Sequence, residues 1–456
     1  MGTVVAVDPI IGGKDARSSD RSVLYSVLGA PLADIGMAPR LQAQAALNQI
    51  RADADGVPPD SSIFSTAAQL FADSTVDGQS ADEYTASVTA STGLTAATVR
   101  QAVRELVEEI EDLPASTRAN LPDTDLGNGF RTRWVARGRV FAGVMASNHP
   151  GPNVSWVRAL FHGYSVIIRP GSRDPFTPLR LIAALTQAGL PANRIAFLPC
   201  AHEVGTFLLR QADRGIIYGG ERAVRTWRQD DTVAVRGPGS TKALLDSALT
   251  DELVRHLVAS ASFDGGTRCT NLSALLTSES PAEVADVLAE RLSSLPVLPA
   301  DDPTARLLVV DRKRADQLRT QTADLRHTLN DHSARYDEHD PVVELPDGSF
   351  LPRPLVLSAD RADHPAVGTE LPFPFLVVAP WTPQDGIAPL RGSLVLNLMT
   401  QRTDIVDAAV REPSVRKVTM GPVLPWTAVP GIPHDDNYTQ FLLEPKGIVD
   451  ADAIGA

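Results

Sequence analysis

The stretch "RVFAGVMASNHPGPNVSWVRALFHGYSVIIRP", residues 139–170, decides the fold. Two apolar runs of strand length enclose a helical pattern, and the same alternation continues to residue 239. Strands that are apolar throughout and alternate with helices predict a parallel sheet covered on both faces. Ligands of such sheets bind beyond the carboxyl ends of the strands. The loops 146–151, 169–174 and 218–223 are therefore expected to meet at one site.

A second α/β segment follows the first. Helical patterns over 250–263 and 403–412 alternate with strand-like runs at 272–278, 373–381 and 415–420. Ser280 and Glu283 have the spacing of a capping box at the start of another helix. Residues up to 122 are mostly helical in pattern, and the tail from 422 is rich in Pro and Asp. The fold class is thus α/β, with two sheet-containing units and a tail expected to dock.

Composition narrows the classes of function. A chain of 456 residues favours two or three domains, and 43% hydrophobic with 21% charged residues is typical of a globular protein. The net charge of −13 argues against a nucleic-acid partner. No apolar run is long enough to span a membrane, and the N-terminus lacks a signal-peptide pattern, so a cytoplasmic location is expected. The two cysteines, Cys200 and Cys269, do not form a disulfide framework.

Cys269 is the first residue that could carry chemistry. It follows two glycines in "DGGTRC", and the adjacent Arg268 could favour a thiolate. These residues alone also allow a buried cysteine that only fills space. Asn148 follows a strand and could offer its amide N–H to an oxyanion, although it could equally form a turn before Pro150. Arg169, at another strand end, could bind ribose or phosphate oxygens or simply face solvent.

Taken in order, five segments resemble the aldehyde dehydrogenase superfamily: residues 10–36, 143–157, 166–179, 263–276 and 370–378. The resemblance covers nearly the whole chain and implies that Cys269 is the nucleophile and Asn148 the oxyanion donor. It also implies a Rossmann-type cofactor domain, with Trp156 and Arg268 at the substrate pocket and Glu370 on the nicotinamide ribose. Cys200, in an apolar context, is expected to be structural. No metal site is expected.

Departures from the family pattern suggest the cofactor. Arg169 stands where the family has a lysine that contacts the adenosine ribose, and Ser172 replaces an acidic position that disfavours a 2′-phosphate. Arg173 adds a positive charge, so NADPH is expected in preference to NADH. Gly219 and Gly220 are expected to line the same cofactor site, whereas Pro372 replaces an aromatic residue near the nicotinamide.

A further departure suggests the reaction. Arg236 stands where hydrolytic members carry a glutamate that activates water, and a guanidinium cannot act as a general base. We therefore expect NADPH-dependent reduction of a coenzyme A or carrier-protein thioester to an aldehyde through a Cys269 thioester. Two alternatives stay open: an NADP-dependent aldehyde dehydrogenase that forms acid, and a non-catalytic subunit that supports a partner reductase.

The predicted domains follow the same resemblance. Residues 1–125 and 142–237 are assigned to the cofactor domain, 238–421 to the catalytic domain, and 126–141 with 422–456 to oligomerisation arms. Trp134, Phe441 and Leu442 would be unfavourable on the surface of a monomer, which favours a homodimer or homotetramer.

Overall fold

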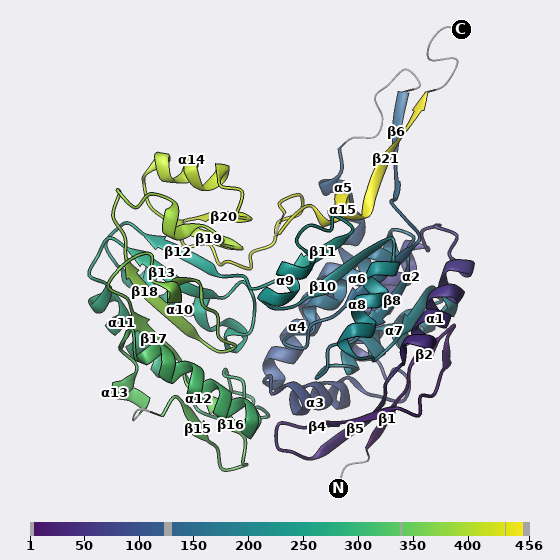
Figure 1. The fold of residues 1–456 in the computed structure, drawn as a ribbon, viewed down its shortest axis with the longest axis horizontal. Helices are drawn as coiled ribbons and strands as arrows, with labels where there is room; N and C mark the ends of the chain where they lie inside the picture. The colour runs from purple at the N-terminus through teal and green to yellow at the C-terminus, as the bar shows by residue number, and fades with distance from the viewer. Residues whose placement is uncertain (1–3, 123–129, 338–339, 434, 450–456) are drawn as a thin grey trace.

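The computed structural model describes residues 4–122, 130–337, 340–433 and 435–449 and forms two lobes, each built on a seven-stranded sheet (Figure 1). The predicted assignments at residues 1–3, 123–129 and 450–456 lie outside the described residues. In the described part, no helix has the length and apolar character that crossing a membrane requires.

The first sheet confirms the predicted alternation. Its strand order is β11-β10-β7-β8-β9-β2-β3, and the five strands from β7 to β11 are parallel. These strands are β7 (Val140–Val144), β8 (Ser165–Arg169), β9 (Ile195–Phe197), β10 (Arg214–Tyr218) and β11 (Val233–Arg236). The connecting helices are α6 (Val154–Phe161), α7 (Phe176–Gln187), α8 (His202–Gln211) and α9 (Glu221–Trp227). Every residue of β7 is buried, as expected for a strand that helices cover on both faces.

The N-terminal region is less helical than its pattern predicts. Five short strands precede the first helix: β1 (Val5–Val7), β2 (Ile10–Ile11), β3 (Lys14–Asp15), β4 (Arg21–Tyr25) and β5 (Pro31–Gly36). Five helices follow: α1 (Arg40–Asp53), α2 (Ser61–Asp73), α3 (Ala81–Thr92), α4 (Ala96–Glu111) and α5 (Leu113–Asn120). The strands were missed because they are too short for a period-two pattern to be visible.

The second sheet has the order β14-β17-β18-β13-β12-β19-β20. Its strands are β12 (Thr241–Leu245), β13 (Leu272–Thr277), β14 (Asn330–Asp331), β17 (Leu355–Ser358), β18 (Phe375–Pro380), β19 (Val395–Met399) and β20 (Lys417–Met420), with a separate pair β15 (Val342–Glu344) and β16 (Phe350–Pro352). Its helices are α10 (Asp251–Ser262), α11 (Pro281–Ser293), α12 (Arg312–Arg326), α13 (Ala334–Asp337) and α14 (Thr403–Arg411). The chain passes from one lobe to the other between β11 and β12.

Two local predictions in this part of the chain were wrong. Ser280 does precede α11, but its side chain makes no capping hydrogen bond. A capping box forms instead at α3, where Ser80 and Glu83 bond each other's backbone N–H. Helix α12 was also missed, because its sequence is strongly polar and carries little apolar periodicity.

The two predicted arms lie side by side as an antiparallel ribbon that projects from the first lobe (Figure 1). It consists of β6 (Phe130–Ala136) and β21 (Leu443–Val449), preceded by the short helix α15 (Tyr438–Leu442). Leu442 is fully buried within its own chain, and Trp134 and Phe441 are partly buried. The monomer therefore already covers Leu442, whereas Trp134 and Phe441 keep part of their surface exposed, and the assembly stays a prediction.

Candidate active site

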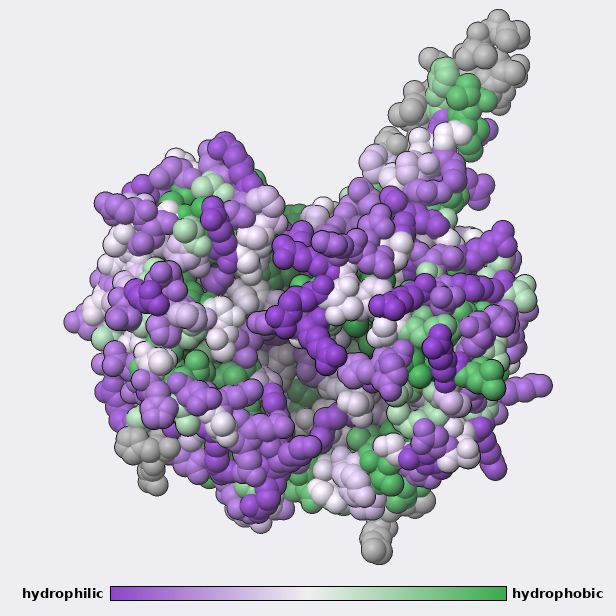
Figure 2. Space-filling view, in the orientation of Figure 1, coloured by the Kyte–Doolittle hydropathy of each residue, from purple (hydrophilic) through white to green (hydrophobic). Residues whose placement is uncertain are grey.

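A cleft of about 1380 Å³ lies between the lobes, at the carboxyl ends of β7, β8, β10 and β11. Figure 2 shows the surface hollowed between the two lobes, with hydrophilic side chains along much of the rim. The three loops that the sequence predicted to meet all contribute to its wall, and the segments 266–273 and 370–375 close the other side. Among the described residues that line this cleft, the carboxylates are Glu203 and Glu370.

Cys269 and Asn148 both line the cleft and are exposed to it. The Asn148 side-chain amide donates a hydrogen bond to the Thr267 carbonyl oxygen at 2.9 Å, so the loop after β7 is attached to the cysteine segment. An amide NH₂ group has a second N–H, which can stabilise an oxyanion formed on a carbonyl held at Cys269. The structure thus brings these two predicted residues together.

The backbone before Cys269 requires its glycines. Asp264, Gly265 and Gly266 form a left-handed run with φ of 50°, 69° and 75° within the 3₁₀ segment η3 (Phe263–Gly266). A Cβ on Gly266 would lie 2.4 Å from the Pro374 nitrogen, so no side chain fits there. The segment before Cys269 therefore packs directly against the backbone that enters β18.

The Cys269 thiol is not activated as the sequence suggested. Cys269 is open to the cleft, yet the cleft walls remove much of the water around its thiol. This burial, followed by the negative charges of Asp435 and Glu370, raises the pKa of Cys269 to about 12. Arg268 is not among the groups that lower it. Cys200 is buried, which raises its pKa to about 11, in keeping with the structural role predicted for it.

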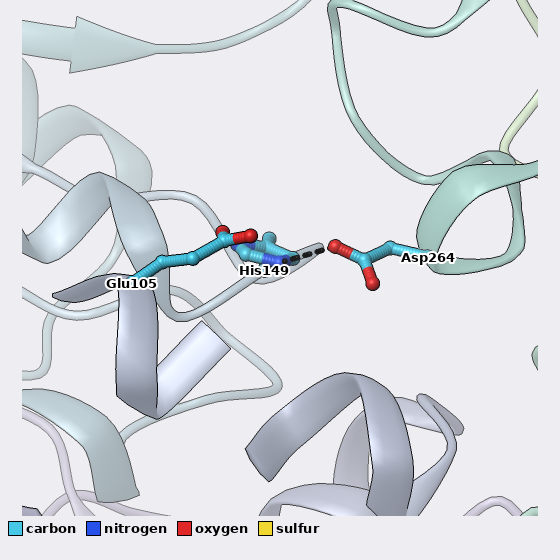
Figure 3. Close-up of side chains that lie close together, drawn as sticks. All are labelled: Glu105, His149 and Asp264. Carbon is cyan, nitrogen blue, oxygen red and sulfur yellow. Dashed lines mark hydrogen bonds and ion pairs between the residues drawn. The ribbon is translucent and has the colours of Figure 1, made fainter. Parts of the chain in front are cut away.

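Arg268 lines the cleft, as predicted, but its guanidinium is paired with carboxylates. It forms ion pairs with Asp264 and Glu105, and His149 Nε2 lies 3.3 Å from the same Asp264 carboxylate. Figure 3 shows Glu105 from α4, His149 from the loop after β7, and Asp264 converging from separate elements. The spacing of these three would allow a metal ion, but the Arg268 guanidinium already supplies the positive charge between the carboxylates. We interpret the group as an ion-pair network that fixes the segment before Cys269.

Arg236 lines the cleft from the end of β11, and its guanidinium is held by two carboxylates. The Asp435 carboxylate lies 2.7 Å from its Nε and that of Asp436 lies 2.9 Å from Nη2. Burial acts to lower the pKa of Arg236, but Asp435 and Asp436 outweigh it and keep the pKa above its ordinary value. Arg236 also lies over the Tyr438 ring, 5.5 Å from its centroid. A fixed cation therefore stands at this strand end and joins the cleft to the C-terminal segment.

The predicted cofactor residues divide into two groups. Arg169, Ser172, Gly219 and Gly220 line the cleft. A Cβ on Gly219 would lie 2.7 Å from the Ala223 side chain, so a side chain is unfavourable there, whereas nothing lies within 4 Å of a Cβ on Gly220. Arg173 instead forms an ion pair with Asp311 at 2.8 Å, across the lobes, and is not brought to the cofactor groove.

Trp156 is likewise not brought to the substrate pocket. It is fully buried on α6 in the core of the first lobe, and its indole N–H donates to Asn153 Oδ1 at 2.9 Å. Pro372 and Phe373 do line the cleft. Sequence reasoning placed Trp156 from spacing alone, which cannot tell the core-facing side of a short helix from the side that faces a cleft.

Sequence reasoning also missed several cleft residues. Arg40, Arg210 and Arg222 lie in the cofactor-lobe wall, and Tyr218 ends β10 beside the cysteine. Burial raises the pKa of Tyr218 to about 12, so its hydroxyl stays protonated. Tyr218 directly precedes the predicted glycines and Arg222 follows them by two residues, so the rule that ligands meet at strand ends could have found both. Arg40 carried no such signal, because it begins a helix far away in the sequence.

Comparison with known proteins gives a consistent result. Residues 28–387 match the aldehyde dehydrogenase family. N-succinylglutamate 5-semialdehyde dehydrogenase of Caulobacter sp. (strain K31) is 28% identical over 239 residues, 47% of this chain and 49% of that protein. Malonate-semialdehyde dehydrogenase 2 of Geobacillus thermodenitrificans is 26% identical over 163 residues, 34% of this chain and 33% of that protein. The matched regions thus span half or less of these curated relatives.

Solved structures agree over a longer range. An indole-3-acetaldehyde dehydrogenase in complex with NAD⁺ superimposes with a TM-score of 0.83 at 16% identity, covering 98% of this chain and 96% of that one. An NAD⁺ complex of an aldehyde dehydrogenase from Bacillus cereus gives a TM-score of 0.78 at 13% identity, covering 97% and 96%. The fold is therefore shared over nearly the whole chain. Together with the family match, these findings show that the chain belongs to the aldehyde dehydrogenase family and has the fold of an oxidoreductase that acts on aldehydes.

Proposed function

We propose that this chain reduces an activated acyl group, carried as a coenzyme A or carrier-protein thioester, to an aldehyde with NADPH. The single observation that carries the proposal is Arg236, a cation fixed by Asp435 and Asp436 at the strand end where hydrolytic relatives have a glutamate. A guanidinium cannot take a proton from water at neutral pH. An acyl group on Cys269 is therefore slow to hydrolyse and remains available for reduction.

The chain's own residues support each step. Cys269 Sγ bonds to the acyl carbon, the carbon–sulfur bond to the carrier breaks, and the carrier leaves as a thiol. Asn148 stabilises the negative charge on the carbonyl oxygen while both bonds exist. A bound nicotinamide would supply the hydride. The Cys269–carbon bond then breaks, the aldehyde leaves, and the cysteine regains its proton.

The preference for NADPH is part of the proposal. Arg169, Arg210 and Arg222 line the cofactor wall, and Ser172 leaves it without an acidic side chain at that position. Glu203 lines the same wall and opposes the binding of a 2′-phosphate. We expect the several arginines to outweigh this single carboxylate, since contacts between arginine and phosphate are charge-assisted.

Oxidation of an aldehyde to an acid is the second candidate. The names of the curated relatives, which are semialdehyde dehydrogenases, and the NAD⁺ complexes among the solved structures favour it. Glu370 also favours it, because burial raises the pKa of Glu370 to about 7 and so provides a possible base for water.

The two candidates separate in one experiment. The enzyme is acylated with a panel of acyl-coenzyme A thioesters, the excess is removed, and the Cys269 adduct is followed by intact mass with and without NADPH. We expect slow decay alone and fast release of aldehyde with NADPH, with little effect of NADH. Rapid release of free acid without cofactor would contradict the reductase and favour the dehydrogenase. Failure of any thioester to acylate Cys269 would also contradict it.

We also propose a homodimer or homotetramer joined through the β6–β21 ribbon. An isolated two-stranded ribbon is marginal in water, and Ile448 and Val449 on β21 are exposed. Light scattering at micromolar concentration is expected to give a multiple of the chain mass. A monomer under these conditions would contradict the proposal.

A further inference from the structure

A turn between β11 and β12 joins Glu370 to the backbone of Cys269. The Ser240 N–H donates to Glu370 Oε1 at 2.6 Å, and the hydroxyl of the next residue, Thr241, donates to the Cys269 carbonyl oxygen at 3.1 Å. A Cβ built on Gly239 would lie 1.7 Å from that carbonyl oxygen and 3.1 Å from Glu370 Oε1. The carboxylate and the cysteine backbone therefore flank the same glycine, with no side chain between them.

The backbone of this turn is strained at Ser240, the residue whose N–H binds Glu370. Ser240 has φ of 43°, a left-handed conformation that non-glycine residues adopt at a cost of about 1 kcal/mol. Its hydroxyl donates to the Gly368 carbonyl oxygen at 3.0 Å, two residues before Glu370. Ser240 thus holds the Glu370 loop at two points, and the strained conformation directs its N–H at the carboxylate.

The other charged groups around Cys269 are already paired. Arg236 is bound to Asp435 and Asp436, on the C-terminal segment, and Arg268 is bound to Glu105 and Asp264. Tyr218, on β10, carries a neutral hydroxyl. The negative charge of Glu370 reaches the thiol and contributes to the raised pKa of Cys269.

Glu370 is held differently from these groups. Burial raises its pKa to about 7, against two backbone N–H donors that act to lower it. A base whose pKa lies near the working pH is the most effective acceptor for a proton that is shared in a transition state. Of the two carboxylates among the described cleft residues, Glu370 is the one that the Gly239–Thr241 turn joins to the Cys269 backbone.

We propose that Glu370 is the base that takes the proton of the Cys269 thiol as the cysteine attacks. The S–H bond breaks as the Sγ–carbon bond forms, the proton moves to a Glu370 carboxylate oxygen, and the departing carrier thiolate takes it back. Oxidation state does not change in this step, so it serves both directions of the reaction. The proposal rests on the proposed role of Cys269 as nucleophile, and it adds a role for Glu370 beyond the ribose contact expected from the family resemblance.

The test measures alkylation of Cys269 by iodoacetamide across a range of pH, followed by intact mass, with neither acyl substrate nor cofactor present. In the wild-type protein the rate is expected to rise as pH increases through about 7, because Glu370 becomes an anion there. In Glu370→Gln the rate near neutral pH is expected to fall about 10²-fold, the lower end of general-base effects. At strongly alkaline pH the variant is expected to match or exceed the wild type, because glutamine removes a negative charge that disfavours the thiolate.

Controls separate a base from a structural support. Glu412→Gln changes another carboxylate that accepts a backbone N–H, from Ser414, but lies outside the cleft residues, so it is expected to keep the wild-type profile. Cys269→Ser identifies the labelled residue. A Glu370→Gln profile equal to wild type, or one lowered equally at every pH, would overturn the proposal. If Glu370→Gln does not fold, Glu370→Ala is used instead, and an unchanged neutral-pH rate in that variant would overturn the proposal.

The outcome is independent of the thioester experiment. Crossing alkylation profiles with no acylation by any thioester would support Glu370 as the base and contradict the reductase. Acylation by a thioester with parallel alkylation profiles would support the reductase and contradict the role of Glu370.

Discussion

Two carboxylates in the segments around Cys269, Asp264 and Glu370, are both partly buried and differ in their partners. Burial acts to raise the pKa of Asp264, but His149 and Arg268 bring it below its ordinary value. Glu370 has only backbone N–H donors, and burial raises its pKa to about 7. The comparison teaches that a charged partner, rather than burial alone, decides whether a carboxylate near the cysteine is a structural anion or a base.

The largest effect is expected when the Cys269 thiol is removed. Cys269→Ala is expected to abolish acyl adducts and turnover, because no other thiol faces the cleft among its described residues. NADPH binding, measured by fluorescence titration, should remain near the wild-type value, since the cofactor wall is unchanged. Turnover close to wild type in this variant would rule out a covalent mechanism.

The next largest effect is expected when the charge of Asp264 is removed. Asp264→Asn leaves Arg268 short of one buried carboxylate, and breaking such a pair typically costs about 3 kcal/mol or more. Asparagine tolerates the left-handed backbone at this position, so the change isolates charge from conformation. Urea denaturation is expected to show this loss, whereas the alkylation profile of Cys269 should keep its rise near neutral pH.

The exposed pair Arg402–Asp404 provides the control for that measurement. Asp404→Asn is expected to change stability by much less, because exposed pairs contribute about 1 kcal/mol at most. Equal losses for the two variants would mean that the Asp264 network is not a buried structural unit.

The same contrast between a side chain with a charged partner and one without recurs in the residues predicted to bind the cofactor. Arg169 donates to the backbone carbonyls of Cys200 and Pro170 and forms no ion pair with a described residue, whereas Arg173 is paired with Asp311. Arg169→Ala is expected to lower kcat/KM for NADPH by about 10- to 100-fold relative to NADH, the magnitude of a charge-assisted contact. Arg173→Ala should leave the ratio unchanged. If Arg173→Ala changed the NADPH/NADH ratio of kcat/KM more than Arg169→Ala, Arg173 would contact the cofactor despite its ion pair with Asp311.

The smallest effect is expected from a change in the turn that holds Glu370. Ser240→Gly removes the strain of a left-handed serine but keeps the N–H that binds Glu370. We expect the free energy of unfolding to rise by about 0.5 kcal/mol. Relief of the strained backbone raises it, whereas loss of the serine hydroxyl bond and the greater flexibility of glycine in the unfolded chain offset part of the gain. The pH at which alkylation rises should not move. A shift of that pH would mean that the serine hydroxyl, rather than the backbone N–H, sets the basicity of Glu370.

Much of the fold was predictable because it depends on local patterns. Apolar runs at residues 139–147 and 164–170, separated by a helix, specify a parallel sheet wherever they occur. The position of Asn148 was predictable for the same reason, since it follows a parallel strand, whereas Cys269 precedes β13 and was predicted from the family resemblance. Trp156 and Arg173 were placed by spacing, which does not define the direction of a side chain.

The sequence by itself determined the alternation of strands and helices and the family resemblance, and it predicted Cys269 as the nucleophile. Tertiary structure alone decided the charge state of the groups around it. Arg268 looked like an activator of Cys269 until Glu105, 163 residues away in the chain, paired with it. Glu370 looked like an ordinary loop carboxylate until the turn at Ser240, 130 residues away, held it in the cleft. The reason is physical: a pKa depends on which charges and how much water surround a group in space, and neither is encoded by neighbours in sequence.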